Sequence, residues 1–278
     1  IKLKDALENN NDDVSLKLIY HRLHQSMNNI HLLKIKLNQF GFEGIENLSE
    51  DLEKILGGEL LNKITDLDND YVPSKHRSVL KHVLDLSEKN KRVVIWGYYV
   101  DSIKRLHKLL KSNGLNGEII IGETPKGKNR DIELEDSEEH SRQKIIKNFK
   151  SKASNLDYII TNPIVLGESV SLHKVCHDSI YFEFTYNAAP YIQSRDRIHR
   201  VWLHENKQVE YETNYYHYLS ITNKGRTDID DRIFNRLNSK FNRMLEIIDH
   251  DIPLFIEEND STEIMGIIKE IIQDYGTT

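Results

Sequence analysis

Apolar residues in the middle of the chain form short continuous runs that alternate with amphipathic stretches. The runs are Arg92–Gly97, Glu118–Ile121, Tyr158–Thr161 and Ser179–Glu183. Between them, Tyr99–Ser112 and Ser141–Phe149 carry apolar residues at helical spacing. Continuous apolar runs are typical of strands that are buried on both faces, and strands alternating with helices favour parallel βαβ units. The pattern therefore predicts an α/β fold in which helices cover both faces of a parallel sheet.

Helical periodicity dominates the two ends of the chain. The predicted helices cover Val14–Phe40 with a break near Asn28-Asn29, Leu48–Ile64 with an interruption at Gly57-Gly58, Ser74–Lys89, Thr227–Ile248 and Thr262–Tyr275. Val209–Ile221 is rich in tyrosine and β-branched residues and predicts a return to the sheet. We therefore expect a helical lead-in over residues 1–72, an α/β lobe over 73–225 and a C-terminal helical brace over 226–278.

The composition is that of a globular protein, with 38% apolar and 29% charged residues. No apolar run approaches the roughly 20 residues of a membrane span, and the single cysteine, Cys176, excludes an internal disulfide. We expect a cytoplasmic protein without a membrane partner. The chain starts at Ile1 rather than Met, which suggests a fragment of a longer protein.

The net charge of −6 does not exclude a local nucleic-acid groove, because the charge is unevenly spread. Residues 246–278 carry nine acidic side chains and one lysine, whereas residues 140–152 are basic.

Candidate chemistry gathers in the stretch Tyr191–Arg200. If this stretch is helical, Gln193, Arg197 and Arg200 share one face, with Asp196 beside them. Two guanidiniums and a carboxamide on one face suit a phosphate chain. The alternative is a solvated helix that is held by surface salt bridges.

The loop Thr161–Leu172 follows a predicted strand, at the sheet edge where α/β proteins place ligands. Gly167 permits a close approach of the backbone, while Ser169 and Ser171 offer hydroxyls and amides to phosphate. An ordinary strand-to-helix loop is the alternative.

Two further patterns resemble binding sites, but their residues favour other interpretations. Gly122–Asn129 nearly spells a phosphate-binding loop, but Asn129 lacks the metal-binding hydroxyl and the following residues are too acidic. A variable surface insertion is the better interpretation. His173, Cys176 and His177 lack a fourth zinc ligand at suitable spacing, which favours packing. We find no Ser-His-Asp or paired-carboxylate constellation.

The pattern Q-x-x-D-R-x-H-R at Gln193–Arg200 resembles the sixth motif of superfamily 2 helicases, specifically the Swi/Snf-like double-stranded DNA translocases. Thr161–Leu172 resembles the fifth motif, in a form closer to a bacterial branch of the family. Val93–Tyr99 resembles the fourth motif, and Gly122 with the helix Arg142–Phe149 resembles the element after it. The resemblance covers roughly Pro73–Pro253.

This resemblance implies a second RecA-like helicase lobe with helical flanks. ATP and Mg²⁺ would bind mainly to a first lobe that lies N-terminal in the same protein, and double-stranded DNA would be the other partner. Arg197 and Arg200 would act as arginine fingers, and Gln193 would sense the phosphate or orient the fingers. Gly167, Glu168 and Asp196 would lie on the nucleotide side. The implied nucleic-acid contacts are Gly97, Tyr98, Gly122, Arg142, Thr161, Asn162, Ser169 and Ser171.

The sequence lacks both the phosphate loop and the acidic metal-binding motif of a first lobe, so we expect this chain alone to hydrolyse essentially no ATP. The alternative function is a non-catalytic nucleic-acid or protein-binding module on the same lobe. The bacterial likeness suggests a role in defence against foreign DNA or in restriction.

Overall fold

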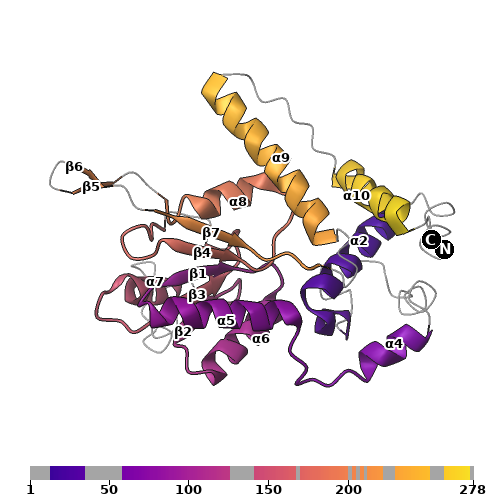
Figure 1. Ribbon diagram of the computed structural model, residues 1–278, viewed down its shortest axis with the longest axis horizontal. Helices are drawn as coiled ribbons and strands as arrows, with labels where there is room; N and C mark the ends of the chain where they lie inside the picture. Colours follow the sequence, from indigo (N-terminus) through magenta and orange to yellow (C-terminus); the bar gives the residue numbers. More distant parts are fainter. Residues whose placement is uncertain are drawn as a thin grey trace. The chain divides into compact units, whose positions relative to one another are not determined.

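The computed structural model describes residues 13–34, 58–125, 141–166, 170–199, 202–204, 207–209, 212–221, 229–250 and 260–275 (Figure 1). The chain forms two compact units. One comprises residues 74–218, and the other combines residues 1–73 with residues 219–278. The division into functional domains at residues 72 and 225 remains a prediction.

The unit of residues 74–218 contains a five-stranded sheet with the order β2-β3-β1-β4-β7. The strands are β1 Val93–Trp96, β2 Gly117–Ile120, β3 Tyr158–Thr161, β4 Asp178–Tyr181 and β7 Asn214–His217. Every neighbouring pair is parallel. The parallel sheet and the return of the chain after residue 209 are therefore confirmed, with strand ends within two residues of those predicted for the first four strands.

Helices cover both faces of this sheet (Figure 1). They are α5 Ser74–Glu88, α6 Val100–Ser112, α7 Arg142–Lys150 and α8 Ala188–Arg195. Residues of α5 and α6 share one core cluster with Val93, Ile95 and Ile160 of the strands. The chain crosses the sheet in the opposite direction through α7 and α8, and right-handed crossovers therefore place these two helices on the other face. The predicted fold class, a RecA-like parallel sheet with helices on both faces, is confirmed.

A small antiparallel hairpin, which the sequence pattern did not predict, lies between α8 and β7. It comprises β5 Trp202–His204 and β6 Lys207–Val209 and forms a two-stranded sheet of its own.

The other unit is helical in the residues that the structure describes. Its elements are α2 Asp13–Asn28, the 3-10 helix η1 Ile30–Lys34, α4 Gly58–Thr65, α9 Ile229–His250 and α10 Asp260–Tyr275. The break predicted near Asn28-Asn29 is confirmed, since α2 ends at Asn28. Both α9 and α10 contact α2. None of the described helices is long and apolar enough to span a bilayer.

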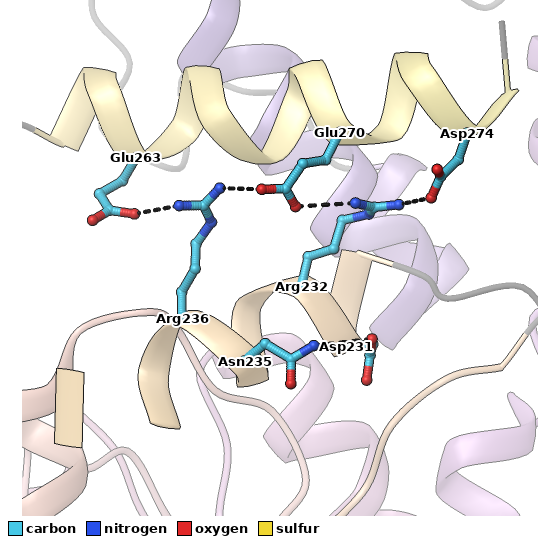
Figure 2. Close-up of polar contacts among 7 residues, drawn as sticks. All are labelled: Asp231, Arg232, Asn235, Arg236, Glu263, Glu270 and Asp274. Atoms are coloured by element: carbon cyan, nitrogen blue, oxygen red, sulfur yellow. Dashed lines mark hydrogen bonds and ion pairs between the residues drawn. The ribbon is translucent and has the colours of Figure 1, made fainter. Parts of the chain in front are cut away.

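A ladder of ion pairs joins α9 to α10 (Figure 2). Arg236 bonds Glu263 at 2.9 Å and Glu270 at 2.7 Å. Arg232 bonds Glu270 at 3.0 Å and also Asp274. Arg232 and Arg236 thus each bridge two carboxylates, which lie about one turn apart along α10 for Arg232 and about two turns apart for Arg236.

Candidate functional site

Four of the predicted nucleic-acid contacts meet where β1 and β3 end. The amide of Gly97 donates to the carbonyl of Thr161 at 2.9 Å. The Asn162 side chain donates from Nδ2 to the Tyr98 carbonyl at 3.2 Å and accepts the amide of Ile164 at 2.8 Å. Because these strands are parallel and adjacent, their carboxyl ends lie at one edge of the sheet. The structure therefore brings Gly97, Tyr98, Thr161 and Asn162 together.

These four residues differ in how much they offer to a ligand. Tyr98 is 38% exposed. Thr161 is fully buried, and its hydroxyl donates to the Ile120 carbonyl at 2.8 Å. Gly97 is also buried. Thr161 and Gly97 thus shape the edge, whereas Tyr98 and Asn162 keep part of their surface open to solvent.

Gly122 and Arg142 lie together beyond the end of β2. The Arg142 guanidinium donates to three backbone carbonyls, those of Thr124 at 2.9 Å, Gly122 at 2.9 Å and Ile121 at 3.2 Å. It therefore holds the turn after β2 against the start of α7. The exposed cations of this helix are instead Lys144, Lys147 and Lys150, and Ser141 caps its N-terminus by accepting the Lys144 amide.

The continuous helix that would place Gln193, Arg197 and Arg200 on one face is not found in the described residues. Helix α8 ends at Arg195, with Asp196 as its C-cap. The amides of Arg197 and Ile198 then bond to carbonyls three residues back, in tight turns, and the amide of His199 bonds to the Arg195 carbonyl four residues back. Gln193 and Asp196 are exposed, Arg197 is only 8% exposed, and Arg200 lies outside the described residues.

An aromatic cluster fixes α8 against the sheet. The Tyr181 hydroxyl and the Ser194 hydroxyl lie 2.7 Å apart, and the Tyr191 hydroxyl lies 3.0 Å from Nε2 of His217. The His217 ring stacks on Tyr181 with centroids 4.9 Å apart. Burial, assisted by the nearby charge of Arg195, lowers the pKa of His217 to about 4. A neutral His217 therefore belongs to the packing that orients the stretch carrying Arg197.

A backbone hydrogen bond joins the predicted phosphate loop to this stretch. The amide of Leu172 donates to the carbonyl of Arg197 at 2.7 Å. Just before it, the Ser171 hydroxyl lies 2.6 Å from Nδ1 of His173. Gly167, Glu168 and Ser169 lie outside the described residues.

The structure describes Cys176 and part of the stretch Gly122–Asn129, the two sequence patterns that do not favour a ligand site. Cys176 is buried and donates to the carbonyls of Arg92 and Asp178, both at 3.3 Å. Burial raises the pKa of its thiol to about 12, as expected of a packed cysteine. Of the stretch Gly122–Asn129, residues 126–129 lie outside the described part of the chain.

Glu183 lies at this edge of the sheet and was not predicted as a site residue from the sequence. The carboxylate of Glu183, two residues beyond β4, accepts the amides of Tyr98 and Tyr99, both at 2.9 Å. The signal available in the sequence was an acidic residue that closes an otherwise apolar run, Ser179–Glu183. An acid at the end of a buried strand is common at ligand sites as well as at helix caps, so the pattern alone could not assign it.

Comparison with known proteins gives one family match and a likeness to a solved structure. Residues 75–201 match the family described as the helicase conserved C-terminal domain. Among solved structures, the chain is similar to the crystal structure of the C-terminal part of the Fun30 ATPase domain. The identity is 18% and the TM-score 0.48, over 93% of this chain and 74% of that one. No curated protein matches the sequence. The chain thus contains a region similar to the C-terminal domain of helicases.

Proposed function

We propose that the chain is the second RecA-like lobe of a Swi/Snf-like, ATP-dependent translocase on double-stranded DNA. The hydrogen bond between Leu172 and Arg197 carries this proposal. It ties the loop after β3 to the arginine stretch after α8, inside the region that matches the helicase domain. A first lobe, N-terminal in the same protein, would complete the nucleotide cleft.

On the nucleotide side, the residues of this chain would neutralise charge and sense the phosphates. ATP with Mg²⁺, held mainly by the first lobe, supplies the phosphoryl-transfer chemistry. Arg197 and Arg200 would stabilise the negative charge that develops, with Gln193 and Asp196 beside them and Gly167 and Glu168 in the adjoining loop. Because Arg197 is 8% exposed, its side chain must turn outward when the first lobe closes.

On the nucleic-acid side, the residues at the ends of β1, β2 and β3 would contact one backbone of the duplex. Tyr98 and Asn162 present open surface, and Ser171 follows in the next segment. Ser169, two residues earlier in the sequence, lies outside the described residues. The exposed lysines of α7 add positive charge, which attracts phosphates without reading sequence. Opening and closing of the cleft would move this grip along the duplex, and the setting we propose is bacterial defence against foreign DNA.

The test is ATP hydrolysis by the intact protein with duplex and with single-stranded DNA. We expect stimulation by duplex DNA, and a loss of about 10³-fold or more in kcat in Arg197→Ala and in Arg200→Ala. DNA affinity should stay within about threefold, because fingers act on the transition state. Arg77→Ala, an exposed arginine of α5, is the matched control and should keep full activity.

This chain by itself should hydrolyse essentially no ATP. Robust turnover by the isolated chain, or a loss of DNA binding that parallels the loss of kcat, would contradict the proposal.

The burial of Arg197 favours a second candidate, a non-catalytic binding module that has kept the lobe. In that case the intact protein binds its partner without ATP turnover, and neither arginine substitution changes binding.

A further inference from the structure

A buried carboxylate stands at the centre of the sheet edge described above. Glu183 is 1% exposed and lies two residues beyond β4. Its own amide donates to the Trp96 carbonyl at 3.2 Å, and the Phe182 amide donates to the same oxygen at 3.0 Å. The backbone of β4 therefore continues alongside the last residue of β1 and brings the Glu183 side chain to the turn that follows it.

That side chain caps the helix after the turn. The amides of Tyr98 and Tyr99 both donate to Oε2 of Glu183 at 2.9 Å. Tyr99 is the N-cap residue of α6 and makes no cap hydrogen bond with its own side chain. A helix start leaves amides without intrahelical partners and carries partial positive charge. Glu183 thus accepts, from another strand, the amides of the N-cap residue and of the residue before it; in a capping box a local glutamate at N3 accepts the N-cap amide in the same way.

The turn itself is packed closely against α6. A Cβ added at Gly97 would lie 2.6 Å from Cγ1 of Ile103, whereas its 3.7 Å from Oε2 of Glu183 is an ordinary van der Waals contact. Burial raises the pKa of Glu183, while the Ser102 hydroxyl, the two tyrosine amides and the charge of Lys75 act in the opposite direction. The groups that favour the charged form come from the starts of α5 and α6, so the carboxylate is enclosed by several elements.

We propose that Glu183 is a positioning residue that couples the nucleic-acid side of the lobe to its nucleotide side. It fixes the backbone at Tyr98, whose side chain is exposed at the edge. Five residues later the same segment enters α8 at Ala188, the helix that leads into Arg197. A displacement of the Tyr98 backbone by a bound duplex is thereby transmitted to the start of the arginine stretch. This inference rests on the proposed function.

The experiment compares three variants of the intact protein in DNA-stimulated ATP hydrolysis. Glu183→Ala removes the acceptor, and Glu183→Gln keeps an acceptor oxygen at the same place. Asp157→Ala is the matched control, because Asp157 accepts the Asn116 amide and the Ser87 hydroxyl, both at 2.7 Å, at the opposite edge of the sheet. Melting temperature is measured for each variant, and activity is assayed well below it.

We expect the duplex concentration for half-maximal stimulation to rise about tenfold in Glu183→Ala, a typical size for coupling between two sites. Glu183→Gln and Asp157→Ala should stay within about threefold of wild type. The inference is overturned if Glu183→Ala loses only melting temperature, if Glu183→Gln rises as much as Glu183→Ala, or if Asp157→Ala does so. Absence of any stimulation in the wild type refutes the proposed function instead.

Discussion

The ion-pair ladder between α9 and α10 predicts that Gly266→Ala destabilises α10, although alanine has a higher helix propensity than glycine. Gly266 lies inside α10, and replacing glycine by alanine in a helix interior usually stabilises by about 1 kcal/mol. Here, however, an added Cβ would lie 2.7 Å from Nη2 of Arg236. That guanidinium is the group that bonds Glu263 at 2.9 Å and Glu270 at 2.7 Å (Figure 2). Gly266→Ala must therefore displace it.

The size of the effect follows from how exposed these pairs are. The side chains of Arg236 and Glu263 are each 25% exposed, and that of Glu270 is 45% exposed. Partly solvated pairs with good hydrogen-bond geometry contribute about 1 kcal/mol each. Losing both costs about 2 kcal/mol, which outweighs the gain in propensity. We expect Gly266→Ala to destabilise α10 by about 1 kcal/mol, and to stabilise it by about 1 kcal/mol in an Arg236→Ala background.

Native-state hydrogen exchange of the α10 amides is the suitable assay, because it reports the opening of this helix separately from the sheet. The four chains of the double-mutant cycle should show a coupling free energy of about 2 kcal/mol between the two positions. Arg243→Ala, an exposed arginine on α9, is the control and should change α10 protection by less than about 0.5 kcal/mol. If Gly266→Ala stabilises α10 equally with and without Arg236, the guanidinium moves aside at no cost and the reasoning is wrong.

Two further predictions concern the unit of residues 74–218, where denaturant unfolding can be followed through the fluorescence of Trp96 and Trp202, the only tryptophans. The folded-state pKa of His217, about 4, lies below the ordinary 6.5, so its contribution is complete above pH 6.5 and is lost as the pH falls from 6.5 to 4. His217→Gln should reduce the fall in unfolding free energy between pH 6.5 and pH 4 by about 3 kcal/mol, because each unit of pKa difference corresponds to about 1.4 kcal/mol. An unchanged slope would exclude His217 as its source. Gly117→Ala should destabilise by about 1 to 3 kcal/mol, because its Cβ would lie 2.4 Å from Cζ of the Tyr158 ring; a neutral result would show that the ring can move.

The strands at the centre of the chain were predicted well because each is a continuous run of apolar residues, and such a run is stable only when both faces of the strand are buried. Val93–Trp96 and Tyr158–Thr161 are completely buried, which is what an uninterrupted apolar run requires. Helix α8 was predicted less well. The four- and three-residue spacing of Gln193, Arg197 and Arg200 suggested a continuous helix, but the helix ends at Arg195. The spacing of residues in the sequence indicates which of them would share a helix face, but it does not indicate where the helix ends.

The site residues differ in the same way. The sequence placed Tyr98 and Asn162 after separate strands, and the parallel order of the sheet makes their positions adjacent. It gave no means of seeing that the Arg142 guanidinium is occupied by backbone carbonyls, or that Glu183 reaches the start of a helix from a different strand. Such partners are separated by 18 to 84 residues in the chain, and no local pattern encodes them.

Periodicity, apolar runs and the Q-x-x-D-R-x-H-R stretch thus determined, from the sequence alone, the fold class and the kind of chemistry to look for. The tertiary structure alone decided which polar groups hold the backbone in place and which keep surface open to a ligand. The physical reason is that burial of apolar surface depends on local patterning, whereas the partner of a hydrogen-bonding group depends on which distant segment the fold brings within about 3 Å.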